Sequence, residues 1–340
     1  MNANTDAAAA RRLLDLINGS WVAQACYVIA RLGIADLLAA GPRSSEELAA
    51  ATQTNAAALG RLLNALGSVD ICRQRDDGSF EMTQLGTLLR ADVPCSMRAW
   101  ALQWGGEAWQ IWANLLHSIK TGSSARSLVT GNEGFGHLDR DPQAAQIFNQ
   151  AMVDLTRLAA VDIAQAYDFS DRRIVDVGGG YGALLAQILV ANPGAKGVLF
   201  DMEHAISRAR EYLASRGVAE RCEFIAGDFF SSVPSGADLY LLKTVIHDWP
   251  DDRAREILQC CRRAMSPGAR LLIIERLMPE RLEPSAENRA LARVDLHMLV
   301  ALGAQERTLA QMLALLAGAG LKQLRRIATP CEFQIIEAQA

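Results

Sequence analysis

The chain has 340 residues, half of them hydrophobic and 21% charged, with a formal net charge of −4. This length allows two domains that each bury a core, and the composition excludes a disordered or collagen-like chain. Because no strong positive charge is present, a nucleic-acid partner is not expected.

Residues 1–100 are predicted to form a winged-helix domain. Apolar side chains recur at spacings of three and four over residues 11–40, which indicates an amphipathic helix that Gly33 interrupts. Ser44 and Glu47 have the spacing of a capping box, and Asn55 can cap a third helix that ends near residue 69. A short hairpin is expected over residues 71–82. Three helices followed by a hairpin are typical of a winged helix.

Residues 101–167 are predicted to be a helical connector that contributes to a substrate pocket. Four of the six tryptophans lie between residues 100 and 112, so this stretch is expected to bury a large aromatic surface. Residues 142–167 are predicted to form one long helix, because Asp141 precedes a proline, which a first helical turn tolerates.

Residues 168–340 are predicted to form an α/β catalytic domain with a Rossmann-like parallel sheet. Short apolar runs alternate there with helical segments, which is the pattern of a doubly wound sheet. Two further runs, 324–327 and 332–337, are close enough to form an antiparallel hairpin at the sheet edge. The parallel strands are expected at residues 174–177, 197–200, 222–226, 239–242 and 271–274.

Neither a secretory signal nor a transmembrane helix is expected. The N-terminus lacks a basic start followed by an apolar stretch. The longest uninterrupted apolar runs are about half of the roughly 20 residues that span a bilayer. The seven cysteines form no Cys-x-x-Cys pair and have no histidine at ligand spacing, so they predict neither disulfides nor a zinc site. The protein is therefore expected in the cytoplasm.

A glycine-rich turn, DVGGGYG at residues 176–182, follows an apolar strand and precedes a helix. Main-chain N–H groups and the helix N-terminus would face a ligand at the carboxyl edge of the sheet. Gly178, Gly180 and Ala183 also satisfy the dinucleotide fingerprint. This turn alone therefore predicts a nucleotide-type cofactor without separating NAD from S-adenosylmethionine.

Acidic residues at the ends of three successive strands favour S-adenosylmethionine. The carboxylate of Asp176 would repel a pyrophosphate and attract an ammonium group. Asp201 can accept the ribose hydroxyls of either cofactor. Asp228 can accept from the adenine amino group while Phe229 packs on the ring. An adenosine without a second nucleotide suits this set best, although each acid could also be an ordinary polar residue at a strand end.

His247 follows the fourth strand and is the candidate general base. A phenol has a pKa near 10, so a histidine of unperturbed pKa about 6.5 can remove its proton as the oxygen attacks a methyl group. Glu275 ends the fifth strand and Glu306 precedes another helix; either carboxylate could fix the tautomer of the imidazole. The alternatives are a structural histidine and two solvent-exposed glutamates.

These motifs, in this order, resemble those of the caffeate and hydroxyindole type of O-methyltransferase and of bacterial relatives that modify polyketides and phenazines. The resemblance includes the His-Asp-Trp sequence at residues 247–249, Glu-Arg-Thr at 306–308 and Phe-Asn-Gln-Ala-Met at 148–152. It implies that His247 is the base, that Glu275 and Glu306 flank it, that the N-terminal domain forms a homodimer, and that no metal takes part. The cofactor contacts expected are Asp176, Gly178, Gly180, Asp201, Met202, Asp228, Phe229, Lys243 and Trp249.

Position within this family's pattern also suggests which residues line the acceptor pocket. Phe148, Met152 and Met298 are the main candidates and Trp104 is a further one, although each could instead fill a core. Plant members have a histidine where this chain has Leu155, so their substrate contacts do not transfer. A hydroxyphenazine, a phenolic polyketide and a simpler hydroxylated aromatic all stay open.

Three alternative functions remain at this stage. A winged-helix regulator is disfavoured because residues 43–90 hold five arginines against six acids. An NAD-dependent oxidoreductase would use the same glycine spacing. Within the methyltransferases, an acceptor with a ring nitrogen would need no base. The sequence therefore predicts an S-adenosylmethionine-dependent O-methyltransferase of secondary metabolism, with N-methylation as the nearest alternative.

Overall fold

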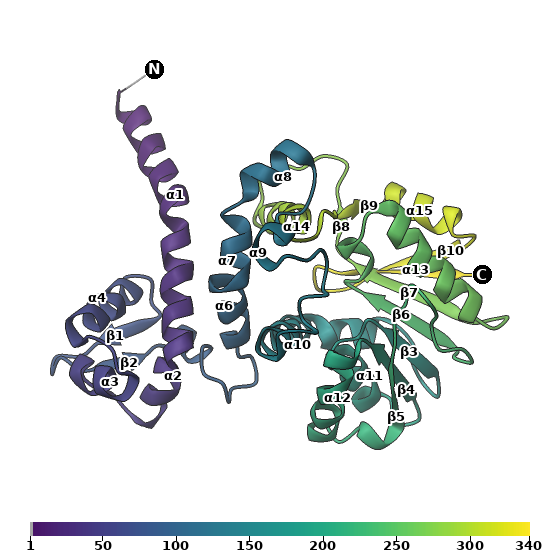
Figure 1. Ribbon diagram of the computed structural model, residues 1–340, viewed down its shortest axis with the longest axis horizontal. Helices are drawn as coiled ribbons and strands as arrows, with labels where there is room; N and C mark the ends of the chain where they lie inside the picture. The colour runs from purple at the N-terminus through teal and green to yellow at the C-terminus, as the bar shows by residue number, and fades with distance from the viewer. Residues whose placement is uncertain (1–2) are drawn as a thin grey trace. The chain divides into compact units, whose positions relative to one another are not determined.

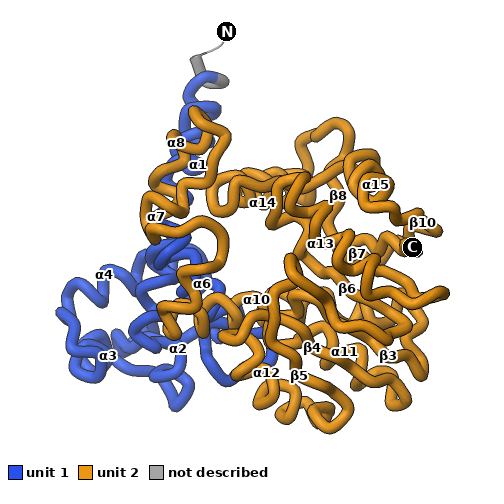
Figure 2. The backbone as a smooth tube through the Cα atoms, turned by 45° about the vertical axis from the view of Figure 1, so that its right-hand side comes forward, with its two compact units in different colours: residues 1–109 blue, residues 110–340 orange. Residues whose placement is uncertain are grey.

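The computed structural model describes residues 3–340 and divides into two compact units, residues 1–109 and 110–340 (Figure 2). Each unit has a hydrophobic core of its own. The predicted boundary at residues 167/168 falls inside the second unit.

The helices of unit 1 begin and end at the predicted signals. The first helix stops at Gly33, which has a left-handed φ of +67°. Ser44 and Glu47 exchange the two hydrogen bonds of a capping box, and the side chain of Asn55 accepts from the N–H of Ala58 at 3.0 Å. The elements are α1 (Ala3–Leu32), α2 (Ile34–Leu37), η1 (Leu38–Ala40), α3 (Ser45–Thr52), α4 (Ala56–Gly67), β1 (Cys72–Gln74), β2 (Phe80–Met82), α5 (Gln84–Thr87) and α6 (Arg98–Gly105).

The predicted hairpin is present and closes the core of unit 1. β1 and β2 pair antiparallel, with Cys72 opposite Met82, and Arg43 adds an isolated bridge to Phe80. Side chains of α3 and α4, including Leu48 and Leu63, are fully buried beneath this hairpin's apolar residues in one cluster. The winged-helix prediction for the N-terminal domain is therefore confirmed.

The part of α1 before residue 23 contributes little to that core. Leu13, Leu16, Ile17 and Trp21 are all more than half exposed. By length and composition, Asp6–Leu32 is also long and apolar enough to cross a membrane. No such helix was expected from the sequence, because polar residues interrupt the apolar residues of α1 and no uninterrupted apolar run of that length occurs there.

Unit 2 begins with helices that lead into one long helix. The side chain of Asp141 accepts from the N–H groups of Gln143 and Ala144, and Pro142 occupies the first turn. The helix predicted over 142–167 is thus confirmed. These helices are α7 (Glu107–Trp112), which begins in unit 1, α8 (Leu115–Thr121), α9 (Arg126–Thr130) and α10 (Pro142–Ala166).

The core of unit 2 is a seven-stranded sheet in the order β10-β11-β7-β6-β3-β4-β5 (Figure 1). The five strands from β7 to β5 run parallel to one another, whereas β11 is antiparallel to both β7 and β10. The predicted Rossmann-like sheet with an antiparallel edge is confirmed. The strands are β3 (Arg173–Val177), β4 (Lys196–Asp201), β5 (Cys222–Ala226), β6 (Leu239–Lys243), β7 (Arg270–Glu275), β10 (Lys322–Ala328) and β11 (Gln334–Gln339).

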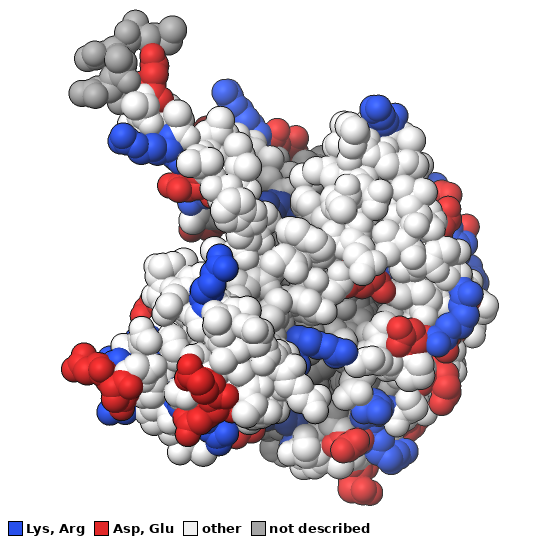
Figure 3. Space-filling view, turned by 60° about the vertical axis from the view of Figure 1, so that its left-hand side comes forward, with Lys and Arg blue, Asp and Glu red and all other residues white. Residues whose placement is uncertain are grey.

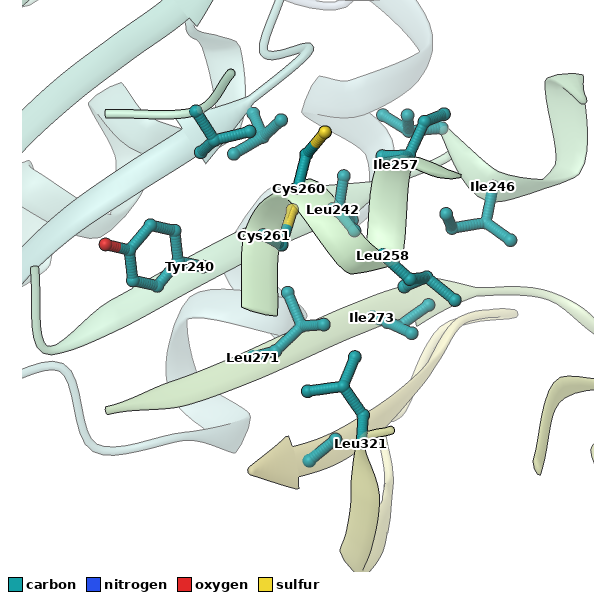
Figure 4. Packing of buried hydrophobic residues seen from close by; sticks show 14 of the residues in the cluster. Tyr240, Leu242, Ile246, Ile257, Leu258, Cys260, Cys261, Leu271, Ile273 and Leu321 are labelled. Atoms are coloured by element: carbon teal, nitrogen blue, oxygen red, sulfur yellow. The ribbon is translucent and has the colours of Figure 1, made fainter. Parts of the chain in front are cut away.

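Alternate residues of the central strands belong to two separate cores, because side chains of a strand point to opposite faces. Tyr240 and Leu242 pack with α13 on one face (Figure 4), in a cluster that also includes residues of α15. Leu239 and Leu241 pack with α10, α11 and α12 on the other face. The near-continuous apolar runs in the sequence reflect this double burial. The covering helices are α11 (Ala183–Ala191), α12 (Glu203–Ser215), η2 (Ala219–Arg221), η3 (Ile246–Asp248), α13 (Asp251–Ala264) and α15 (Leu309–Gly318).

A second, two-stranded parallel sheet lies beyond the end of β7. β8 (Leu277–Met278) pairs with β9 (Arg307–Thr308), with Leu277 opposite Arg307. α14 (Ala286–Leu302) connects these two strands. The sequence analysis did not predict this pairing, which brings the segments that carry Glu275 and Glu306 together.

Charged side chains are dispersed on the face drawn in Figure 3. Basic and acidic groups both occur there, separated by wide uncharged areas, and among the described residues of that face no continuous basic surface is seen. A phosphate backbone needs such a surface for binding. The absence of a nucleic-acid partner stays an expectation from the composition.

Replacing Leu63 by Ala is expected to destabilise unit 1. Leu63 is fully buried in its core, and truncating such a side chain costs roughly 2–5 kcal/mol through lost burial and a residual cavity. Denaturant unfolding of Leu63→Ala would measure this loss. The neighbouring exposed substitution Asn64→Ala is the control, and equal stability of the two variants would contradict the assigned core.

Candidate active site

The glycine turn forms a loop of left-handed backbone at the carboxyl end of β3. Gly178, Gly180 and Gly182 have φ values of +70°, +59° and +78°, which side-chain-bearing residues rarely adopt. The N–H of Gly178 donates to the carbonyl of Phe200 at 2.8 Å, which anchors the loop to β4. Three positive-φ positions within five residues explain why this segment needs glycine.

Asp176 lies beneath this loop rather than projecting from it. Its carboxylate is only 2% exposed, and a Cβ at Gly179 would come within 2.6 Å of its Oδ2. Burial, and to a lesser degree the charge of Asp201, raises the pKa of Asp176 to about 7. A cation bound above the loop would therefore stabilise the ionised form of Asp176.

Asp201 ends β4 and holds the loop from the adjacent strand. Its Oδ2 accepts from the N–H of Gly180 at 2.7 Å, and its Oδ1 accepts from the N–H of Met202 at 2.6 Å. Burial raises the pKa of Asp201, while these two N–H groups act in the opposite direction. Each oxygen keeps a further lone pair, so the carboxylate can still accept from a ligand.

Aromatic rings from two loops converge beside the glycine turn. A Cβ at Gly178 would lie 3.5 Å from the ring of Phe229, which packs edge-on against Trp249 at a centroid distance of 6.0 Å. Asp228 is exposed, and its Oδ1 accepts from the N–H of Phe230. The structure thus brings Gly178, Phe229 and Trp249 together, as a site for a flat ring requires.

Lys243 ends β6 and is tied to α10. Its Nζ donates to Oγ1 of Thr156 at 3.0 Å and lies 5.0 Å from the ring centre of Phe333. Burial lowers the pKa of Lys243 to about 8. Thr156 was not singled out by the sequence analysis, since a threonine inside a long helix gives no signal of this contact.

The turn that carries His247 is held by a single buried carboxylate oxygen. Thr244 has a left-handed φ of +51° and turns the chain away from β6. Oε1 of Glu275 then accepts from the N–H groups of Val245, Ile246 and His247 at 3.1, 3.0 and 3.3 Å. Glu275 therefore positions the backbone of His247, a role that its place in the sequence does not reveal.

Glu306 contacts the imidazole itself. Its Oε1 lies 2.7 Å from Nδ1 of His247, whereas Oε2 of Glu275 lies 3.8 Å from the same nitrogen. Both glutamates are at most 4% exposed, so solvent exposure, the alternative considered above, is excluded. The parallel pairing of β8 with β9 explains how residues 275 and 306 reach one imidazole.

These contacts fix the chemical state of the imidazole. Nδ1 donates to Glu306, which leaves Nε2 as the nitrogen that can take up a proton; Oδ1 of Asp248 lies 3.4 Å from it. Burial alone would lower the pKa of His247, but Glu275, Glu306 and Asp248 outweigh it and raise the pKa to about 10. Burial also raises the pKa of Glu275, to about 7.

Arg307 holds the same turn from its carbonyl side. Its guanidinium donates to the carbonyl oxygens of Ile246 at 2.8 Å and Trp249 at 2.7 Å, and it pairs with Asp251. At 1% exposed, Arg307 is the largest fully buried side chain among the described residues. This role of Arg307 was not predicted, because the sequence alone does not show whether an arginine is buried or exposed.

The candidate pocket residues are only partly brought together. Phe148 packs in a tilted arrangement against Phe135, with ring centres 5.5 Å apart, and Phe135 lies 6.1 Å from Trp249, so Phe148 joins the aromatic group at the loop. Met298 is buried and Met152 half-buried. Trp104 belongs to α6 of unit 1, where it packs against Trp100, and its pocket role stays a prediction.

One polar pair near Met298 was also not foreseen. Nε1–H of Trp112 donates to Nδ1 of His297 at 2.9 Å, and the planes of the two rings are nearly parallel. Burial lowers the pKa of His297 to about 4, so this second imidazole is neutral.

Ligand atoms of His247, Glu275 and Glu306 lie within 4.8 Å of one another, close enough to surround one cation. Oε1 of each glutamate already accepts hydrogen bonds. The absence of a metal therefore stays an expectation of the sequence analysis.

Replacing Glu306 by Gln is expected to lower the pKa of His247 towards 6.5, because the carboxylate at 2.7 Å stabilises the imidazolium. NMR titration of the imidazole nitrogens would follow the midpoint in both proteins. Asp295→Asn, which keeps an acceptor for the N–H of Glu306, is the control. An unchanged midpoint in Glu306→Gln would refute this electrostatic coupling.

Comparison with known proteins matches both parts of the chain. Residues 112–322 match the O-methyltransferase domain and residues 14–92 match the O-methyltransferase dimerisation domain. The chain is 43% identical to the phenazine O-methyltransferase PhzM of Lysobacter antibioticus over 96% of its length and 95% of that protein. It is 34% identical to the phenazine-1-carboxylate N-methyltransferase of Pseudomonas aeruginosa, covering 98% of both chains.

A solved structure shows the same architecture with ligands bound. An O-methyltransferase from neocarzinostatin biosynthesis, in complex with S-adenosylmethionine and 2-hydroxy-5-methyl naphthoic acid, superposes with a TM-score of 0.79 at 32% identity. The match covers 94% of this chain and 95% of that one.

Proposed function

Since the chain belongs to the O-methyltransferase family that joins a dimerisation domain to a catalytic domain, we propose that it methylates a hydroxyl group of a small planar aromatic metabolite. A hydroxyphenazine or a phenolic polyketide is the acceptor class that its relatives suggest. Membership of this family sets aside the oxidoreductase and the winged-helix regulator. The methyl donor is S-adenosylmethionine, which the family uses.

The loop at the end of β3 fits this donor. Two of its left-handed glycines leave no room for a side chain, since a Cβ would lie 3.0 Å from Val245 at Gly178 and 2.7 Å from Leu213 at Gly182. We assign Asp201 to the ribose hydroxyls, Phe229 and Asp228 to the adenine, and Asp176 to the ammonium group. Gly178, Gly180, Met202, Lys243 and Trp249 complete the proposed contacts. When bound, the donor supplies an electrophilic methyl group on a sulfonium.

The observation that carries the proposal is the buried His247–Glu306 pair at the same sheet edge as this loop. Val245, two residues before His247, contacts the loop at Gly178. The base and the donor site are therefore parts of one region of unit 2. A pairing of imidazole and carboxylate 2.7 Å apart, both buried, is the arrangement that general-base catalysis uses.

His247 is proposed to take the hydroxyl proton on Nε2 while Glu306 receives the Nδ1–H hydrogen bond. With its pKa raised to about 10, His247 matches the pKa of a phenol, near 10, so the proton can be shared between the two. The base form of His247 grows as the pH rises towards its pKa. Methyl transfer to a neutral phenol is therefore expected to accelerate with rising pH over this range.

Phe148, Met152 and Met298 are proposed to line the acceptor pocket, with Trp104 as a further candidate. Phe148 contacts Phe135, which packs against Trp249, so an aromatic acceptor would lie among rings that favour edge and stacked contacts. The identity to an N-methyltransferase of P. aeruginosa keeps a ring nitrogen as the second candidate acceptor.

A homodimer is proposed to cover the apolar face of α1. Leu16, Ile17 and Trp21 are exposed in the single chain, and residues 14–92 match the dimerisation domain. A partner chain explains this exposure without a membrane. We accordingly propose that the enzyme acts in the cytoplasm, with neither a nucleic-acid nor a membrane partner.

The direct test incubates the protein and S-adenosylmethionine with a panel of hydroxyphenazines, phenolic polyketides and simple phenols. Mass spectrometry is expected to show a gain of one methyl group on at least one hydroxylated aromatic, and EDTA is expected to leave the rate unchanged because no metal takes part. Methylation of ring nitrogens alone would favour the second candidate. Loss of activity with EDTA would refute the metal-free mechanism.

His247→Ala is expected to slow O-methylation roughly 10²–10⁴-fold while the affinity for S-adenosylhomocysteine stays the same, because only the base is lost. Steady-state kinetics and calorimetry measure the two quantities. His117→Ala in α8 is the matched control. A variant as fast as wild type would show that the acceptor needs no general base.

A further inference from the structure

Asn149 is a buried polar residue of α10 to which the proposed mechanism gives no role. It lies between the pocket candidates Phe148 and Met152 in the sequence and is 3% exposed. Its Nδ2 donates to the carbonyl of Ala145 at 2.9 Å. Because a carbonyl only accepts, this bond fixes the orientation of the amide, and Oδ1 is the acceptor that faces away from the helix backbone.

This oxygen faces the glycine loop. A Cβ at Gly180 would lie 3.6 Å from Oδ1 of Asn149, in ordinary van der Waals contact. Gly180 itself has a φ of +59° and donates its N–H to Asp201. The N–H of Gly180 is thus already used by Asp201, and among the described residues no hydrogen bond to Oδ1 of Asn149 is formed. Oδ1 of Asn149 is not one of the fully buried oxygens that lack a partner among the described residues, so it is open to solvent and can accept a hydrogen bond from a ligand.

The groups around Oδ1 of Asn149 indicate that a positively charged hydrogen-bond donor would bind there. Asp176 lies beneath Gly179, and its pKa is raised by burial, so the region favours a positive charge. On the same helix, Thr156 lies seven residues after Asn149, two helical turns away on the same face, and accepts from Lys243. α10 therefore presents polar groups along one face towards the carboxyl edge of the sheet.

We propose that Oδ1 of Asn149 accepts a hydrogen bond from the α-ammonium group of S-adenosylmethionine. This inference rests on the proposed function and adds a residue that binds the amino-acid end of the methyl donor. In this proposal the carboxylate of Asp176 attracts the ammonium group electrostatically. Asn149 orients the group, because its amide oxygen is held in a fixed position by the hydrogen bond of the amide to its own helix. The same contact would hold S-adenosylhomocysteine.

Calorimetry with two ligands tests the assignment. S-adenosylhomocysteine carries the amino acid, whereas 5′-methylthioadenosine has the same adenosine and thioether without it. Asn149→Leu, which removes the acceptor at similar volume, is expected to weaken S-adenosylhomocysteine roughly 10- to 100-fold, the range for a hydrogen bond to a charged group. Binding of 5′-methylthioadenosine is expected to stay within about twofold of wild type, and Asn149→Asp is expected to keep most of the affinity for S-adenosylhomocysteine.

Gln146→Leu, on the exposed side of the same helix, is the matched control and should bind both ligands as wild type does. Equal weakening of both ligands in Asn149→Leu would overturn the inference, since it would place the contact on the ribose or in the structure of the loop. Unchanged binding of S-adenosylhomocysteine would overturn it as well. A wild-type protein that binds neither ligand would instead refute the proposed function, and this inference with it.

Discussion

The geometry of the site depends on one carboxylate oxygen, Oε1 of Glu275, which accepts three successive backbone N–H groups of the turn carrying His247. Three such bonds to a buried charge hold a turn that begins with the left-handed Thr244. Arg307 binds the carbonyl groups of the same turn, so its polar backbone is satisfied from both sides. The imidazole consequently has little freedom to move relative to the end of β6.

Burial of these acids has an electrostatic consequence. Removing carboxylates from water disfavours their ionised form, and the nearby imidazolium compensates for part of this cost. The same attraction raises the pKa of His247, so the arrangement that stabilises the turn also makes the imidazole a stronger base. The same charged groups therefore both stabilise the turn and raise the pKa of His247.

A similar principle operates at the glycine loop. Asp201 uses N–H groups of the loop to keep its carboxylate in place, and Asp176 is buried below it. These two carboxylates would repel the negatively charged pyrophosphate of a dinucleotide and would attract the positively charged groups of a sulfonium amino acid. Asn149 of α10 supplies a neutral hydrogen-bond acceptor. This position agrees with the proposed binding of the ligand between α10 and the ends of the strands.

Much of the fold of this protein, and part of its site, could be predicted from the sequence alone. Helix caps such as Asn55, the run of parallel strands, the glycine turn and the identity of His247 as the candidate base all follow from local pattern, because each depends on neighbours in the chain. The backbone contacts of Glu275 and Arg307, and the role proposed for Asn149, do not. They arise from contacts between residues up to 61 positions apart, which only the pairing of β6 with β7, the pairing of β8 with β9 and the packing of α10 bring together. The identity of a residue does not show whether its side chain is buried or which way it points. Those two properties decide what each of these side chains does.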